Sequence, residues 1–189
     1  MSGYSIALFL HLVGVLTLFA GIGLEQLVLR QLRTARTDAQ VREWMGVMRS
    51  RRRIDGPAAL TILVSGGYLV ARGAGYHAWV GAGLIGMVVL AILGAGLGRP
   101  RYVAIGRALG AAEGAGERPV PSSVRERIED PVLRTTAAMR VALGLGIVFD
   151  MTAKPGAVGA IVVLVLALAL GAVAAVRGVG ARGALAGNE

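Results

Sequence analysis

The sequence contains no cysteine. Disulfides, thiolate metal sites, cysteine nucleophiles and iron–sulfur clusters are therefore excluded. Aromatic residues are also scarce, at 5% of the chain, so large rings do not supply its apolar content. The sequence also lacks a P-loop, an HExxH motif and a nucleophile elbow with a candidate base, which sets aside the chemistry that these motifs support.

Small and aliphatic apolar residues dominate instead. Hydrophobic residues make up 55% of the 189 residues, 29 residues are glycine, and the mean hydropathy is +0.67. A formal charge of +9 would suit a nucleic-acid-binding protein, but long uncharged runs separate the arginines into clusters. Such clusters are typical of the loops of a membrane protein. We therefore expect a lipid bilayer around the chain and no nucleic-acid partner.

Five apolar segments are candidates to cross a bilayer as helices: residues 5–29, 57–72, 78–98, 137–153 and 157–176. We predict one all-α domain over residues 1–189, a polytopic transmembrane bundle of about five helices, with cytoplasmic loops at 30–56 and 99–134. Within the second loop, Ser122 or Ser123 is expected to begin a short surface helix.

Two boundaries of these segments rest on particular residues. Asp55-Gly56-Pro57 is expected to begin the second span, because an acidic side chain can cap a helix and proline fits its first turn. The fourth segment contains Arg140 and Asp150, so a partial or re-entrant helix is the alternative for it. A tight turn around Lys154-Pro155-Gly156 is expected to separate it from the fifth span.

Arginine predicts the orientation of the bundle. The two predicted loops and the C-terminal tail hold most of the arginines, whereas the opposite side keeps Arg72 and Lys154. Positively charged loops of membrane proteins stay in the cytoplasm. We therefore predict an outer N-terminus and a cytoplasmic C-terminus in the cytoplasmic (inner) membrane of a bacterium. A cleaved signal peptide is the competing interpretation of the first segment, but that segment lacks a basic n-region.

The first span carries a stripe of residues at alternating steps of three and four, most of them small or ionisable: His11, Gly14, Leu18, Gly21 and Glu25. Residues at this spacing share one face of a helix, and we expect that face to pack against a neighbouring helix, away from lipid. Glu25 is expected to pair with Arg30 or Arg53 near the cytoplasmic end. His11 lies near the outer end, too far along the helix to form one compact site with Glu25.

The fourth span carries a ridge at steps of four: Ala138, Ala142, Gly146, Asp150 and Lys154. Asp150 and Lys154 can pair directly, and an unpaired charge inside hydrocarbon costs several kcal/mol. The predicted topology places both residues at the depth of His11. His11, Asp150 and Lys154 are therefore the candidate cofactor-binding residues, with a purely structural role as the alternative for each.

Three segments, His11-Leu12-Val13-Gly14, Asp55-Gly56-Pro57 and Asp150-Met151-Thr152-Ala153-Lys154-Pro155, resemble a family of predicted bacterial integral membrane proteins of unknown function. The resemblance covers most of the chain and implies no activity. More distantly, a histidine early in the first helix is similar to small membrane proteins that handle haem or copper. That similarity implies His11 as an axial or metal ligand. A bis-histidine haem site needs a second intramembrane histidine, however, and His77 is expected in an outer loop.

Three functions stay open from the sequence. The favoured one is a non-catalytic accessory or scaffold subunit, whose small-residue ridges bind another membrane protein or a second copy of the chain. One alternative is a redox protein that binds haem, of the b type, or a metal through His11 on the outer side. The other is a small proton or ion transporter. The sequence leaves enzymatic activity, and the oligomeric state, undecided.

Overall fold

The computed structural model describes residues 2–111 and 118–186, and the side chains of residues 52, 74 and 177–186 lie outside this description. Its described elements, in chain order, are α1 (Gly3–Thr34), α2 (Asp38–Leu69), η1 (Val70–Ala74), α3 (Ala78–Ala91), η2 (Ile92–Gly98), α4 (Arg99–Ala111), α5 (Ser122–Ile128), α6 (Pro131–Ala153) and α7 (Ala157–Ala186). The two η elements are short π-helical segments that continue α2 and α3.

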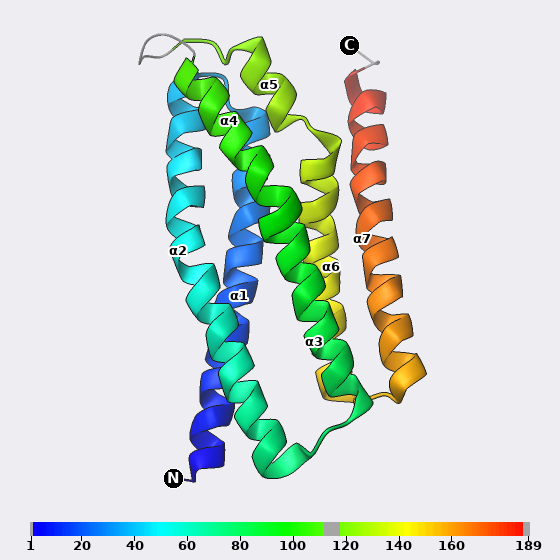
Figure 1. The fold of residues 1–189 in the computed structure, drawn as a ribbon. Helices are drawn as coiled ribbons and strands as arrows, with labels where there is room; N and C mark the ends of the chain where they lie inside the picture. The colour runs from blue at the N-terminus through cyan, green and yellow to red at the C-terminus, as the bar shows by residue number, and fades with distance from the viewer. Residues whose placement is uncertain (1, 112–117, 187–189) are drawn as a thin grey trace.

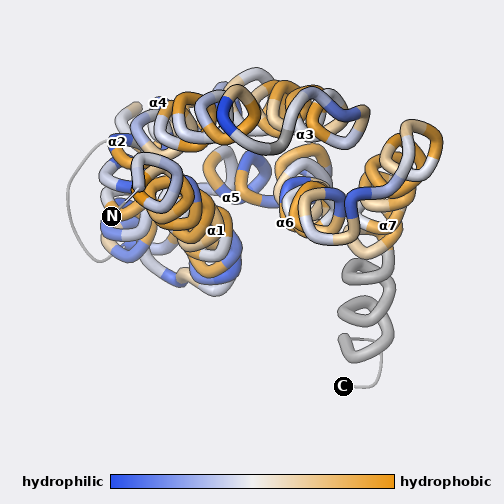
Figure 2. Tube along the Cα trace, turned by 90° about the horizontal axis from the view of Figure 1, so that it is seen from below, coloured by the Kyte–Doolittle hydropathy of each residue, from blue (hydrophilic) through white to orange (hydrophobic). Residues whose placement is uncertain are grey.

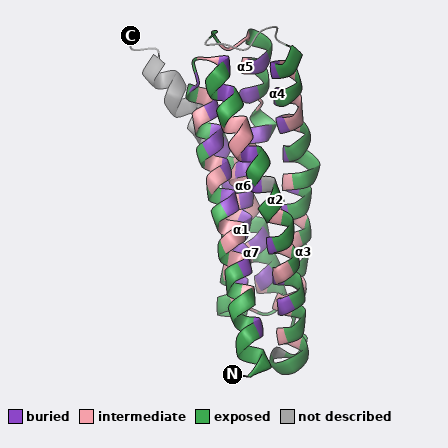
Figure 3. Cartoon of the chain, turned by 90° about the vertical axis from the view of Figure 1, so that its left-hand side faces the viewer, coloured by how far each residue is buried: buried purple, intermediate pink, exposed green. Residues whose placement is uncertain are grey.

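Five stretches of the described chain are helical, long enough and apolar enough to cross a membrane. In Figure 1 they run side by side along one axis. This confirms the predicted all-α bundle of five spans. Large apolar side chains such as Leu16 and Val158 face outward, and Figure 3 shows exposed residues covering the outer surfaces of the long helices. Outward apolar side chains are what a lipid environment accommodates. The membrane side on which each end lies stays a prediction.

The helices extend beyond the predicted spans into the predicted loops. α1 continues to Thr34 and α2 begins at Asp38, so most of the segment 30–56 is helical. The segment 99–134 holds α4, α5 and the start of α6, and its residues 112–117 lie outside the described part of the chain. Charge keeps a segment out of hydrocarbon, but it does not prevent a helix in water. The short surface helix expected after Ser122 is present as α5.

Asp55-Gly56-Pro57 does not begin a helix, so that prediction is wrong. Pro57 lies inside α2, which begins instead at the N-cap Thr37, whose hydroxyl accepts a hydrogen bond from the Gln40 amide. A proline inside a helix removes one backbone hydrogen bond, and helices of membrane proteins tolerate that loss better than soluble ones. Asp55 is thereby free to pair within α2 rather than cap it.

The fourth predicted span is one uninterrupted helix. α6 runs for 23 residues, which is about 34 Å at the usual rise per residue, so the re-entrant alternative is not what the chain forms. The expected tight turn follows it. Lys154 takes the left-handed conformation (φ 50°) at the C-cap, and its amide donates to the Asp150 carbonyl.

α6 lies at the centre of the bundle. It packs on α1, α3 and α7, while α2 packs mainly on α1. Figure 2, which looks along the bundle, shows α6 between these neighbours and α7 at the edge. Glycine permits the close contact of α6 with α7, since a Cβ on Gly171 would lie 2.5 Å from the Cα of Met139. The α1 stripe faces a neighbouring helix as expected, and that helix is α2: a Cβ on Gly14 would lie 2.9 Å from the Ile62 side chain.

The end of the bundle that holds α5, called the α5 end below, has an apolar core of its own. Side chains from α1, α2, α4, α5 and α6 form it, among them Leu32, Val41, Ile105, Ile128 and Leu133. Arg125 of α5 donates hydrogen bonds to the carbonyls of Arg33, in the last turn of α1, and of Ala35, the C-cap of α1. This core explains why the charged segments stay helical. The N-terminus lies at the opposite end, called the N-terminal end (Figure 1).

Candidate functional site

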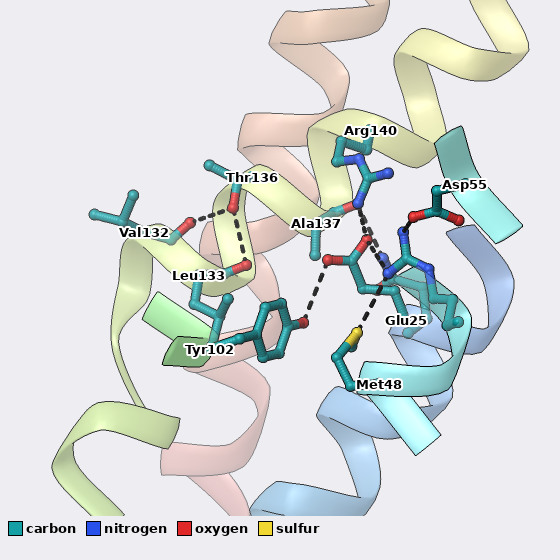
Figure 4. A network of polar contacts seen from close by, with 11 residues as sticks. Glu25, Met48, Asp55, Tyr102, Val132, Leu133, Thr136, Ala137 and Arg140 are labelled. Carbon is teal, nitrogen blue, oxygen red and sulfur yellow. Dashed lines mark hydrogen bonds and ion pairs between the residues drawn. The ribbon is translucent and has the colours of Figure 1, made fainter. Parts of the chain in front are cut away.

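Glu25 is the centre of a buried polar cluster. Glu25 is only 3% exposed, and it lies on the face of α1 that carries the predicted stripe. Arg140 of α6 forms an ion pair with its Oε2 through Nη1. Arg51 of α2 also approaches Oε2, at 3.3 Å from Nη1, and the hydroxyl of Tyr102 in α4 donates to Oε1 at 3.3 Å. Figure 4 shows the Glu25 carboxylate between Tyr102 and Arg140. One carboxylate thus joins four helices.

Arg51 extends the cluster along α2. Its Nη2 donates to Oδ2 of Asp55, one turn further on, at 2.6 Å, and its Nη1 lies 3.4 Å from the sulfur of Met48. Arg51 is 5% exposed and Arg140 is 7% exposed. Buried charges persist in low-dielectric surroundings only when they are paired and hydrogen-bonded. Two guanidiniums and two carboxylates make this group formally neutral.

The pairing of the guanidiniums is incomplete. The Nε atoms of Arg51 and Arg140 are buried, and neither has a hydrogen-bond partner among the described residues. A buried donor without a partner costs about 1–3 kcal/mol. Each of these two guanidiniums therefore keeps one buried donor without a described acceptor.

Glycine makes room for both arginines. A Cβ on Gly94, in η2, would lie 3.0 Å from Cζ of Arg140. A Cβ on Gly21 would lie 3.4 Å from Nε of Arg51 and 2.7 Å from Oδ1 of its partner Asp55. Gly94 and Gly98 have the GxxxG spacing that commonly serves helix packing in membranes. The structure instead places Gly94 beneath a guanidinium, within a π-helical segment of the kind that often marks functional positions.

A cavity of about 400 Å³ lies beside this cluster, between α1, α2, the α3–η2–α4 span and α6. Its polar wall holds Glu25, Arg51, Asp55, Tyr102 and Arg140, to which Arg99 adds a third guanidinium. Its apolar wall is formed by Leu18, Ile22, Met87, Leu90, Ala91 and Ala95, with Met48 and Ala59 from α2. The volume lies within the range of small-molecule sites, which runs from about 300 to 1,000 Å³.

Arg99 differs from the other two arginines. It is exposed and has no ion pair with any described residue. The charged side chains of the cavity wall thus comprise three guanidiniums and two carboxylates. The described wall therefore carries one net positive charge, which favours the binding of an anionic group.

The predicted partners of Glu25 are wrong. Arg30 and Arg53 are exposed, and the carboxylate pairs instead with Arg51 and Arg140. Arg140 is 115 residues away in sequence, so no local spacing could indicate the pair. The signal available for Arg140 was its place inside a predicted span, since an intramembrane charge is a functional candidate by default. Tyr102 had no signal of this kind, because the segment 99–134 was expected to be a loop.

His11 is held by α2. Its Nδ1 lies 3.1 Å from the carbonyl oxygen of Ile62, to which a protonated Nδ1 donates, and 3.3 Å from Oγ of Ser65. The ring packs beside Gly66, where a Cβ would lie 3.1 Å from Cε1. The described polar contacts of His11 are thus confined to α2.

The predicted ion pair between Asp150 and Lys154 does not form. The Lys154 ammonium lies over the ring of Trp79, 5.8 Å from its centroid, and the left-handed cap turns Lys154 away from the α6 ridge. Asp150 is fully buried, and neither carboxylate oxygen has a hydrogen-bond partner among the described residues. The contacts described for His11, Asp150 and Lys154 therefore do not bring the three predicted site residues together.

Comparison with known proteins adds no relative. No protein family, no curated protein and no solved structure matches the chain. The resemblance to a family of bacterial membrane proteins therefore stays an expectation.

Proposed function

We propose that the protein is a non-catalytic accessory protein of the bilayer whose cavity holds the anionic group of a ligand. The observation that carries this proposal is Arg99, a guanidinium on the cavity wall with no ion pair to a described residue. The guanidinium of Arg140, which also lines the cavity, adds a second group of donors at the same wall. A carboxylate or phosphate suits two such donors, since guanidinium geometry matches both groups.

The composition of the wall supports binding rather than catalysis. None of its described residues is Ser, Thr, Cys, His or Lys, the types that act as nucleophiles and bases in most hydrolases and transferases. Glu25 and Asp55 are both engaged by Arg51. The described wall thus offers donors and apolar surface, and its carboxylates serve to neutralise and orient the arginines.

We also propose that the α5 end faces the cytoplasm of a bacterial cell, with the bundle in the inner membrane. The support is the concentration of arginine in α2, α4, α5 and the turns between them. In that orientation the polar wall of the cavity lies near the cytoplasmic leaflet.

Titration of the full-length protein with short anions tests the proposed function. The protein is placed in nanodiscs of phosphatidylcholine, and butyl phosphate and butyrate are titrated by calorimetry. We expect saturable binding that Arg99→Gln weakens about tenfold, the loss of one charge-assisted hydrogen bond. Arg107→Gln is the matched control, because Arg107 is exposed on the same helix α4 but does not line the cavity. Absence of saturable binding, or equal effects of the two substitutions, would overturn the proposal.

The haem or metal alternative has one observation in its favour. An Nδ1–H of His11 that donates to a backbone carbonyl leaves Nε2 as the ligating atom, as in many metal-bound histidines. The predicted companions Asp150 and Lys154 do not fit that site, because their described contacts lie elsewhere. An absorption spectrum of the purified protein, oxidised and then reduced, tests this alternative. A Soret band that shifts on reduction and is lost in His11→Ala would favour it over our proposal.

The transport alternative uses the same cluster differently. A proton or ion path would need Glu25 to change its charge or partners during turnover. Flux across vesicles that is abolished by Glu25→Gln in a folded protein would favour transport. Flux that is absent from the unsubstituted protein would count against it.

A further inference from the structure

We infer that the anionic ligand is an amphiphile of the bilayer, with one anionic group and a single apolar chain, and that it enters the cavity between α2 and α3. This inference rests on the proposed function, which requires only an anionic group. It adds the chemical class of the remainder of the ligand and the route by which the ligand arrives.

The two ends of the cavity differ in chemistry. Arg51, Arg99 and Tyr102 lie toward the α5 end, whereas Leu18 and Met87 lie toward the N-terminal end. From Arg99 back to Met87 is about 18 Å along a helix, by the usual rise per residue. A fully polar ion would leave this apolar part of the cavity unused. A molecule with a charged head and an apolar tail would satisfy both ends.

The cavity reaches the surface on its α2 and α3 sides. Its exposed lining residues include Gly56 on α2, and Ala91 and Ala95 on the α3–η2 span. α2 packs mainly on α1 while α3 packs mainly on α6, which leaves these two helices as the walls of the opening. The wall residues there have small side chains. An opening between two spans gives access from the bilayer rather than from water.

The depth of the opening suits an amphiphile. Gly56 comes three residues after Arg53, and Ala95 four residues before Arg99. Arginines at the ends of apolar stretches mark the level where lipid head groups meet hydrocarbon. An anionic head at that level would reach Arg99 with little loss of its own hydration. A volume of about 400 Å³ is at the small end of ligand sites, which favours one chain over the two chains of a phospholipid.

The test compares chain lengths at constant head group. Dodecyl phosphate and dodecanoate are titrated into the full-length protein in phosphatidylcholine nanodiscs, beside butyl phosphate and butyrate. We expect the long-chain compounds to bind at least about tenfold more tightly, because each methylene buried in the apolar wall adds to the affinity. The phosphate and carboxylate series distinguish lipid-like phosphates from fatty acids as the preferred class.

Partition into the bilayer also concentrates long chains, so a cavity variant is needed. Ala95→Leu narrows the apolar wall, and we expect about a tenfold loss for dodecyl phosphate with butyl phosphate unchanged. Ala20→Leu is the matched control, since Ala20 is exposed on α1 and does not line the cavity. Ala91→Leu replaces Ala95→Leu if the latter does not fold.

The outcomes separate the inference from the proposed function. Equal affinity for short and long chains, with Arg99→Gln still disruptive, would overturn the amphiphile inference and leave the proposed function standing. Tighter binding of long chains that neither cavity variant weakens would place the chain in the bulk bilayer, which also overturns the inference. Failure of every probe to bind would overturn both.

Discussion

Glu25 of α1 and Arg140 of α6 form an ion pair inside the bundle although 115 residues separate them in the sequence. Arg51 shares the same carboxylate oxygen at 3.3 Å. The carboxylate is therefore the only described acidic partner of Arg140 and one of two for Arg51. Removing it would leave Arg140 buried without compensation.

We expect Glu25→Gln to lower the free energy of unfolding by about 3–5 kcal/mol, the cost of breaking a buried ion pair from one side. The measurement is chemical unfolding of the purified protein in detergent. Glu43→Gln is the matched control, because Glu43 is exposed on α2 and has no described ion pair. The double variant Glu25→Gln with Arg140→Met should lose less unfolding free energy than the sum of the losses in the two single variants. Additive losses would show that the two residues act separately.

Glycine positions make a second prediction. A Cβ at Gly171 would lie 2.5 Å from the Cα of Met139, an atom that cannot move without its helix. Gly171→Ala should therefore separate α7 from α6 and destabilise the protein by about 1–3 kcal/mol, the range of overpacking effects. Gly23 is exposed on α1, and a Cβ there would meet no atom within 4 Å. Gly23→Ala should therefore stabilise the protein by up to about 1 kcal/mol. Thermal unfolding of both variants in one detergent gives the comparison, and a stable Gly171→Ala would contradict the close contact.

The sequence predicted the bundle well because apolar length decides whether a helix crosses a bilayer. It also predicted the α1 stripe, since Gly14 and Glu25 share a helical face at their spacing and both contact α2. It failed in the charged segments. There, Val41 and Met48 lie at helical spacing and are buried in the α5-end core. The many arginines around them indicate a segment outside the bilayer, but they do not distinguish a loop from a helix.

The candidate site was predicted only in part. The sequence indicates Glu25 as an ionisable residue inside a span. Its ion-pair partners come from α2 and α6, and spacing within one helix cannot identify a partner on another helix. The Asp150–Lys154 pair failed for a local reason. Pro155 and Gly156 end the helix, so Lys154 adopts a left-handed cap, and four-residue spacing no longer places it over Asp150.

Asp150 gives a third prediction. Asp150 is fully buried, and neither of its carboxylate oxygens has a described hydrogen-bond partner. An ionised Asp150 would therefore destabilise the folded protein. Asp150→Asn keeps the shape without the charge, and we expect no loss of stability and a gain of up to about 3 kcal/mol. Asp55→Asn is the contrasting variant, with an expected loss of about 1–3 kcal/mol, because Asp55 binds Arg51 at 2.6 Å. If both variants lost the same unfolding free energy, the carboxylate of Asp150 would be stabilising the fold, as that of Asp55 does, and the prediction would be wrong.

The orientation gives a fourth prediction, and the absence of cysteine makes it direct to test. Tyr76 is 76% exposed in the turn before α3, at the N-terminal end, and Ser123 is exposed on α5 at the other end. In intact bacterial cells, a membrane-impermeant maleimide should label Tyr76→Cys, whereas Ser123→Cys should react only after lysis, because the arginine-rich end stays in the cytoplasm. The reverse pattern would invert the orientation. The polar wall of the cavity would then lie near the outer leaflet, and the ligand would have to be an amphiphile of that leaflet.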